Sequence, residues 1–124
     1  MKCLIVDEDA RLCRDYAALA ARRGYVCYSV ATLRDARYLL RTHAFDLVLL
    51  DLSVGHEITL GIVDCLDVMD SRALIILVTA STAFSRGEVR QICPRIDYEL
   101  RKPVNLSDLA ALIDHERAPR SAAG

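Results

Sequence analysis

The chain has 124 residues, of which 53% are hydrophobic and 27% are charged. This is the size and composition of one globular domain with a hydrophobic core, and it is too apolar for a disordered chain. A net charge of −1 gives no global electrostatic reason to bind nucleic acid. No apolar stretch reaches membrane-spanning length, and the first predicted strand begins too close to Met1 to leave room for a signal peptide. We therefore expect a cytoplasmic protein that does not bind a membrane.

Short apolar runs alternate with helical patterns along the chain. Five strands are predicted, over residues 3–6, 25–30, 46–51, 73–80 and 97–100. Five helices are predicted after them, over residues 10–24, 33–43, 62–69, 85–93 and 106–116. The first helix is expected to stop at Gly24, and residues 118–124 have the composition of a tail or of the start of a linker.

This alternation predicts the fold class. Strands that alternate with helices imply βαβ units, a parallel sheet and right-handed crossovers. The near-continuous apolar runs of strands three and four fit a sheet that helices cover on both faces. Five strands favour the order 2-1-3-4-5 of a doubly wound, three-layer α/β fold of the flavodoxin type. We predict one such (βα)5 domain over residues 1–117.

The five cysteines, at positions 3, 13, 27, 65 and 93, are widely spaced and odd in number. They form no Cys-x-x-Cys pair and no Cys/His spacing that is typical of a metal site. We interpret them as reduced thiols that serve as small apolar residues.

Polar side chains follow four of the predicted strands. Strand one ends in Asp7–Asp9, strand three in Asp51 and strand four near Thr79, while Lys102 follows strand five. Ligands of such sheets bind outside the carboxyl ends of the strands, at the switch point between strands one and three. The acids therefore flank the predicted crevice, and the hydroxyl and the amine come from the next two strands.

These residue types suit phosphoryl chemistry. Carboxylates that converge repel one another, so they share protons or bind a cation. Mg²⁺ accepts carboxylate oxygens and keeps waters for an incoming phosphate. Lys102 adds a positive charge and Thr79 a hydroxyl for phosphoryl oxygens. With Asp51 as the nucleophile, the groups make a phosphoryl-acceptor site.

Four motifs occur in order, each at the end of a predicted strand: LIVDED, DLVLLDL around Asp51, ILVTA around Thr79, and RKP at Lys102 and Pro103. In these motifs the chain resembles the receiver domain of a bacterial two-component response regulator, over about residues 1–116. Each motif alone is weak, but the four in this order and spacing are specific. The resemblance also implies a cis peptide bond before Pro103.

The resemblance implies a role for each matching residue. Asp51 would be the phosphoacceptor, Thr79 the switch hydroxyl and Lys102 the partner of the phosphoryl group. The implied Mg²⁺ ligands are Asp7, Glu8, Asp51 and the backbone carbonyl of Ser53. Glu8 departs from the family pattern, which usually has Asp there. Asp9 is interpreted as the cap of the first helix, with a role as metal ligand as the alternative.

Two further segments depart from the family pattern. After Asp51, Gly55 and Thr59 stand where the family usually has Pro and Gly, so we expect a more mobile loop or a different start of the next helix. Three residues before the lysine, the family usually has an aromatic switch; here that place is Glu99, with Tyr98 one residue earlier. Neighbours on a strand face opposite sides, so Tyr98 serves as the switch only if a bulge re-aims it. Both alternatives stay open.

The implied function is signalling. A histidine kinase or a histidine phosphotransfer protein would donate the phosphoryl group, and the domain would catalyse only its own phosphorylation and dephosphorylation, with no separate substrate. The face of the fourth helix, fifth strand and fifth helix would then dock a partner or a second copy. Ser53 and Ser81 flank the site and are expected to tune the lifetime of the phosphate.

Two alternatives come from other classes of protein. A divergent receiver that binds partners without phosphorylation would account for Glu8 and for the missing Pro and Gly. A flavin carrier on the same fold would need a loop rich in Ser, Thr and Gly after strand one, where this chain has the acidic DEDARLC.

Overall fold

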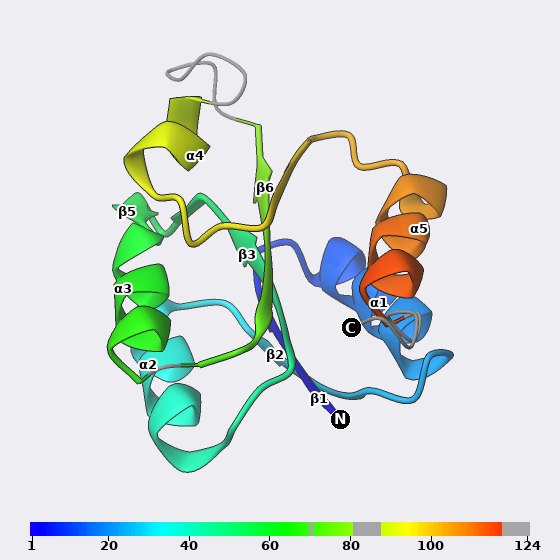
Figure 1. Cartoon of the computed structure of the whole chain (residues 1–124), viewed down its shortest axis with the longest axis horizontal. Helices are drawn as coiled ribbons and strands as arrows, with labels where there is room; N and C mark the ends of the chain where they lie inside the picture. The colour runs from blue at the N-terminus through cyan, green and yellow to red at the C-terminus, as the bar shows by residue number, and fades with distance from the viewer. Residues whose placement is uncertain (70, 81–87, 118–124) are drawn as a thin grey trace, which may run out of the picture.

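The computed structural model describes residues 1–69, 71–80 and 88–117 and shows a parallel five-stranded sheet (Figure 1). Its strands are β1 (Lys2–Val6), β2 (Val26–Val30), β3 (Leu47–Asp51), β6 (Leu74–Thr79) and β7 (Tyr98–Arg101). Their order is β2-β1-β3-β6-β7, and every neighbouring pair is parallel. This confirms the predicted order 2-1-3-4-5.

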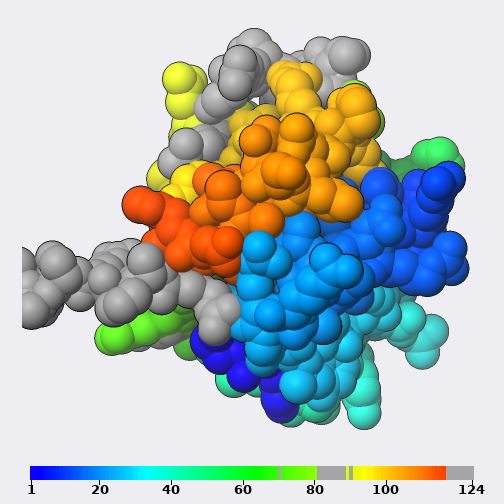
Figure 2. Space-filling view, turned by 90° about the vertical axis from the view of Figure 1, so that its right-hand side faces the viewer, coloured from blue at the N-terminus to red at the C-terminus, as the bar shows by residue number. Residues whose placement is uncertain are grey.

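Helices cover both faces of this sheet. They are α1 (Ala10–Ala21), α2 (Leu33–Thr42), α3 (Leu60–Val68), α4 (Glu88–Ile92) and α5 (Leu106–Arg117). In Figure 1, α1 and α5 lie on one side of the sheet and α2, α3 and α4 on the other. Figure 2 shows α1 and α5 next to each other on the surface of their face. The predicted three-layer arrangement is therefore present.

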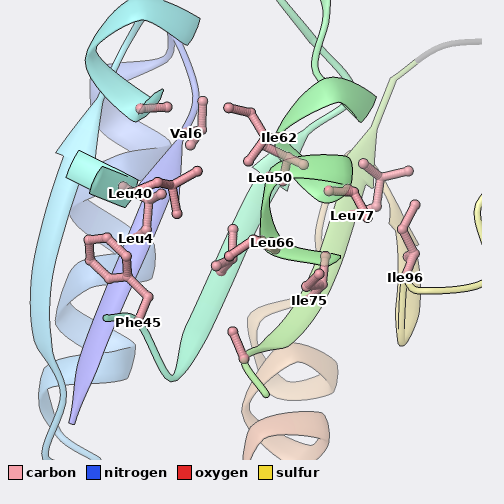
Figure 3. Close-up of a cluster of buried hydrophobic side chains, with 14 of the residues drawn as sticks. Leu4, Val6, Leu40, Phe45, Leu50, Ile62, Leu66, Ile75, Leu77 and Ile96 are labelled. Carbon is pink, nitrogen blue, oxygen red and sulfur yellow. The ribbon is translucent and has the colours of Figure 1, made fainter. Parts of the chain in front are cut away.

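Alternating side chains of the central strands build two separate cores. Leu4, Leu50 and Leu77 point toward α2 and α3 (Figure 3). Ile5, Leu49 and Ile76 point toward α1 and α5. All of these side chains are buried, and complete burial of one such side chain contributes roughly 1.5–3 kcal/mol. The apolar runs are continuous because both faces of the sheet are covered.

A short hairpin after β3 was not predicted. Strands β4 (Ser53–Val54) and β5 (Glu57–Ile58) pair antiparallel across Gly55 and His56, whose φ angles are 57° and 65°. Positive φ at both central residues is the geometry of a type I′ turn, which matches the twist of a two-residue hairpin. His56 is exposed at this turn.

Element ends differ from the predictions by a few residues. Helix α1 ends at Ala21 rather than at Gly24, and α3 begins at Leu60. The predicted tail at 118–124 and the first residues of the fourth predicted helix lie outside the described residues. None of the described helices combines the length and the apolar character needed to cross a membrane.

A substitution at Gly24 tests how much the positive φ angle after α1 contributes to stability. Its φ is +86°, and a Cβ placed on it would meet no atom within 4 Å. We expect Gly24→Ala to lower the free energy of unfolding by about 1 kcal/mol through backbone strain alone. Urea denaturation monitored by circular dichroism measures the change.

The matched control is Gly61→Ala in α3. Gly61 is helical, and an added Cβ would lie 3.3 Å from the flexible end of Arg37. Alanine favours the helix interior over glycine by up to about 1 kcal/mol, so stability is expected to hold or rise. Equal losses in the two variants would contradict the backbone explanation.

Candidate functional site

The carboxyl ends of four strands bring the predicted reacting groups to one rim of the sheet. The Lys102 Nζ atom lies 2.9 Å from Asp51 Oδ2 and 3.1 Å from Asp7 Oδ2. Thr79 is buried at the end of β6, and its carbonyl accepts a hydrogen bond from the backbone N–H of Lys102 at 2.9 Å. The residues predicted from separate strand ends therefore do converge.

Lys102 holds this cluster together electrostatically. Its side chain is 20% exposed, against 3% for Asp7 and 14% for Asp51. Burial alone would lower the pKa of Lys102, but the hydrogen bonds and charges of Asp51 and Asp7 outweigh it, so the pKa is raised above its usual value. The ammonium is therefore charged throughout the physiological pH range, and it faces two carboxylates.

Backbone groups orient the two acids. Asp7 Oδ1 accepts the N–H of Asp9 at 2.9 Å, and Asp51 Oδ1 accepts the N–H of Ser53 at 3.2 Å. The buried Thr59 hydroxyl donates to the carbonyl of Asp51 at 2.5 Å. Thr59 therefore ties the start of α3 to the end of β3. No pattern in the sequence predicts this contact, because the two residues meet only through the intervening hairpin.

The first-turn acids have different partners. The Glu8 side chain is exposed, and its Oε1 atom accepts the N–H of Gly55 at 2.5 Å. Asp9 accepts the N–H groups of Arg11 and Leu12 at 3.0 and 3.2 Å, which confirms it as the cap of α1. Glu8 thus connects the end of β1 to the β4–β5 hairpin.

The described residues fit a magnesium ion in part. Asp7 and Asp51 share one ammonium, and the buried Asp7 Oδ2 atom has no partner in the described part of the chain besides that ammonium. Carboxylate oxygens are what Mg²⁺ prefers. Across residues 1–69, 71–80 and 88–117, however, no group of three or more His, Cys, Asp or Glu is arranged to hold a metal. In this conformation Glu8 contacts Gly55 and is not grouped with the other two acids.

The two candidate switch residues, Tyr98 and Glu99, are neighbours in β7 and lie on opposite faces of the sheet. Its register with β6 runs without interruption from Ile76↔Tyr98 to Thr79↔Arg101, so the bulge considered for Tyr98 is absent within this strand. Tyr98 packs toward α1 and α5, and its hydroxyl donates to Glu116 at 2.7 Å. Strand alternation turns Glu99 to the opposite face, the one that carries α3 and α4.

Glu99 has an unusual environment there. Both of its carboxylate oxygens are buried, and neither has a hydrogen-bond partner in the described residues. A buried carboxylate without partners costs free energy that a partner would recover. Glu99 therefore occupies the place of the expected aromatic residue as a buried polar group without a partner among the described residues.

Tyr16 belongs to the surroundings of the site, although the sequence placed it only in the first helix. It is 1% exposed, and its hydroxyl has no hydrogen-bond partner in the described residues. Burial raises its pKa to about 12, with the charge of Asp7 as the next cause. Neutral Tyr16 is thus a buried hydroxyl close enough to Asp7 to feel its charge.

Two further expectations concern the edges of the site. The Lys102–Pro103 peptide bond is cis, in agreement with the implied geometry. Ser53 lies beside Asp51 in β4 and is exposed, whereas Ser81 lies outside the described residues.

A family model described as the response regulator receiver domain matches residues 3–114. The chain therefore belongs to the response regulator receiver domain family. No match was found among curated proteins.

Solved receiver structures share the fold. A CheY-like receiver domain from Methanospirillum hungatei JF-1 is 23% identical, with a TM-score of 0.81 over 93% of this chain and 91% of that one. TrrA from Thermotoga maritima, in complex with Mg²⁺ and BeF, is 20% identical, with a TM-score of 0.75 over 92% and 96%. A Burkholderia pseudomallei response regulator with a phosphorylated aspartic acid and a calcium ion is 22% identical, with a TM-score of 0.75 over 94% and 72%.

The charge cluster predicts coupled stability effects. Lys102→Met leaves the buried Asp7 beside Asp51 without a cation, so we expect a loss of about 1–3 kcal/mol in the free energy of unfolding. Adding Asp7→Asn should recover part of that loss, because one of the repelling charges is removed. A double-mutant cycle by urea denaturation measures the coupling.

The matched control is the exposed pair of Arg23 and Asp114, 2.8 Å apart with the Asp114 side chain 58% exposed. Arg23→Met should cost less than about 1 kcal/mol, as is usual for surface ion pairs. Additive effects of the Lys102 and Asp7 substitutions would show that these groups are not coupled.

The buried carboxylate of Glu99 leads us to expect that its replacement by an apolar side chain stabilises the fold. Glu99→Met keeps the length of the side chain and removes the unsatisfied carboxylate, so we expect the free energy of unfolding to rise by about 1–3 kcal/mol. Glu57→Met, at an exposed position of the hairpin, should change it by less than about 0.5 kcal/mol. A loss of stability in Glu99→Met would show that the carboxylate has a stabilising partner in solution.

Proposed function

We propose that this receiver domain takes up a phosphoryl group on Asp51. The observation that carries the proposal is the position of Lys102, whose ammonium lies 2.9 Å from Asp51 Oδ2 and 3.1 Å from Asp7 Oδ2. A charge held between two acids is placed to meet phosphoryl oxygens as they arrive at the Asp51 carboxylate.

The proposed step is a phosphoryl transfer. A carboxylate oxygen of Asp51 attacks phosphorus, a P–O bond forms, and the bond between phosphorus and the leaving group of the donor breaks. Asp51 Oδ1 is held by the N–H of Ser53 and Oδ2 by Lys102, so the carboxylate is oriented in advance. Lys102 and the Thr79 hydroxyl then stabilise negative charge on the phosphoryl oxygens.

A magnesium ion bound at Asp7, Glu8, Asp51 and the Ser53 carbonyl would neutralise charge on the phosphoryl group and on the acids. In this chain, the buried Oδ2 atom of Asp7 is paired with the Lys102 ammonium at 3.1 Å and has no other partner within the described residues. Glu8 takes part once it releases the N–H of Gly55.

The proposed output is a change at the face made by α4, β7 and α5. Thr79 precedes α4 in the chain, and its carbonyl holds the backbone of Lys102 directly after β7. A hydroxyl drawn toward a phosphoryl group on Asp51 would therefore act on both elements. The donor would be a histidine kinase or a histidine phosphotransfer protein in the bacterial cytoplasm, and the altered face would bind a partner or a second copy.

A second candidate function is a receiver that binds partners without phosphorylation. The hydrogen bond between Glu8 and Gly55 favours it, because it keeps one predicted metal ligand on the hairpin. The intact arrangement of Asp7, Asp51 and Lys102 favours phosphorylation.

Acetyl phosphate with Mg²⁺ separates the two functions. We expect intact-mass spectrometry to show the addition of one phosphoryl group to the folded chain, and chelation by EDTA to prevent it. Asp51→Asn should abolish the addition because the nucleophilic carboxylate is gone.

The matched control is Asp46→Asn, five residues earlier at the amino end of the same strand, where Asp46 accepts the N–H of Lys2. This variant should be phosphorylated like the unmodified chain. A folded chain that gains no phosphoryl group would favour the second function, and a phosphorylated Asp51→Asn variant would place the acceptor elsewhere.

A further inference from the structure

Two of the five cysteines are direct neighbours across the edge of the sheet. Cys3 of β1 and Cys27 of β2 are register partners in a parallel ladder, and both side chains pack on the face covered by α1 and α5. Neighbouring strands lie about 4.8 Å apart, a separation within the range of Cα distances that a disulfide spans. The sequence spacing of 24 residues hid this contact.

The two thiols interact and differ in exposure. Cys3 is completely buried, whereas Cys27 is partly exposed. The neighbouring Cys3 thiol lowers the pKa of Cys27 to about 7, against burial, which raises it, and the interaction with Cys27 together with burial raises the pKa of Cys3. The Cys27 thiol itself donates to the carbonyl of Ala17 at 3.6 Å. Cys27 is therefore the member of the pair that combines partial exposure with the lower pKa, the two properties that favour reaction of a thiol.

The edge position of β2 lets the two sulfurs approach each other. Within the sheet, β2 pairs with β1 alone. A small shift of β2 toward β1 therefore breaks no second ladder, whereas β1 is held between β2 and β3. The more exposed cysteine therefore lies on the edge strand.

The other three cysteines have different surroundings in the described structure. Cys13 is buried and its thiol donates to the carbonyl of Asp7. Cys65 and Cys93 pack on the opposite face of the sheet from the pair. Among the strand registers of the described residues, Cys3↔Cys27 is the one that joins two cysteines.

We propose that Cys3 and Cys27 form a reversible disulfide when the protein meets a peroxide. The Cys27 thiolate attacks one peroxide oxygen, the O–O bond breaks, and a sulfenic acid forms with release of water after proton uptake. The Cys3 thiol then attacks the sulfenic sulfur, the S–O bond breaks, and a second water leaves. Two thiols are oxidised by two electrons, hydrogen peroxide is reduced to two waters, and a thiol reductant reverses the bridge. This site does not depend on phosphorylation of Asp51.

The test oxidises the folded full chain with hydrogen peroxide, removes the oxidant with catalase, and alkylates the free thiols after denaturation. We expect intact-mass spectrometry to show a species with two thiols protected from alkylation that dithiothreitol restores. Tryptic digestion without reduction should yield residues 3–11 linked to residues 24–34, which each contain one cysteine. Linkage between other peptides, or oxygen addition without linkage, would overturn the proposal.

Two variants sharpen the test. Cys27→Ser should remove the reducible species, whereas Cys65→Ser, a cysteine of the same partly exposed class on the other face, should retain it. A reducible bridge of the same yield in Cys27→Ser would overturn the proposal. Peptide mapping of the unmodified chain decides the question even if a variant fails to fold.

Discussion

The contact of one lysine with two acids is the constraint on which the site depends. Asp7 is 4% exposed, and a buried charge without a counter-ion costs several kcal/mol. Lys102 follows β7, which β6 separates from β3. Only a long side chain spans those strand spacings of about 4.8 Å each. The sheet order and the reach of the lysine together bring the charges to within 3.1 Å.

The hairpin after β3 supports the same cluster from outside the sheet. Glu8 holds the N–H of Gly55, and Thr59 holds the carbonyl of Asp51. These two contacts connect the ends of β1 and β3 to the segment in which Gly55 and Thr59 replace the usual Pro and Gly of the family pattern. The departures in this segment therefore lie in the structure that supports the site, while Asp51, Thr79 and Lys102 match the family pattern.

The covered sheet gives neighbouring residues different surroundings. Alternation along β7 sends Tyr98 to the α5 side, where its hydroxyl finds Glu116, and Glu99 to the α3 and α4 side, where its oxygens find no partner in the described residues. The same rule places Cys3 and Cys27 on one face at the opposite edge of the sheet. The alternation of side chains along a strand thus determines the face of the sheet on which the candidate switch residue lies, and also the face on which the candidate redox pair lies.

The sequence by itself determined the layers, the strand order and the four strand ends that carry the site, because apolar periodicity and polar ends are local properties of the chain. Tertiary structure alone determined which hydrogen-bond or ion-pair partner each acidic side chain of the site has. Glu8 and Asp7 are adjacent, yet one reaches the hairpin and the other Lys102. Tertiary structure also determined the β4–β5 hairpin, the face of the sheet on which Tyr98 lies, and the pairing of Cys3 with Cys27. Such pairings depend on strand register and on turns that bring together residues far apart in the sequence. The periodicity of apolar residues along the chain contains no information about these contacts.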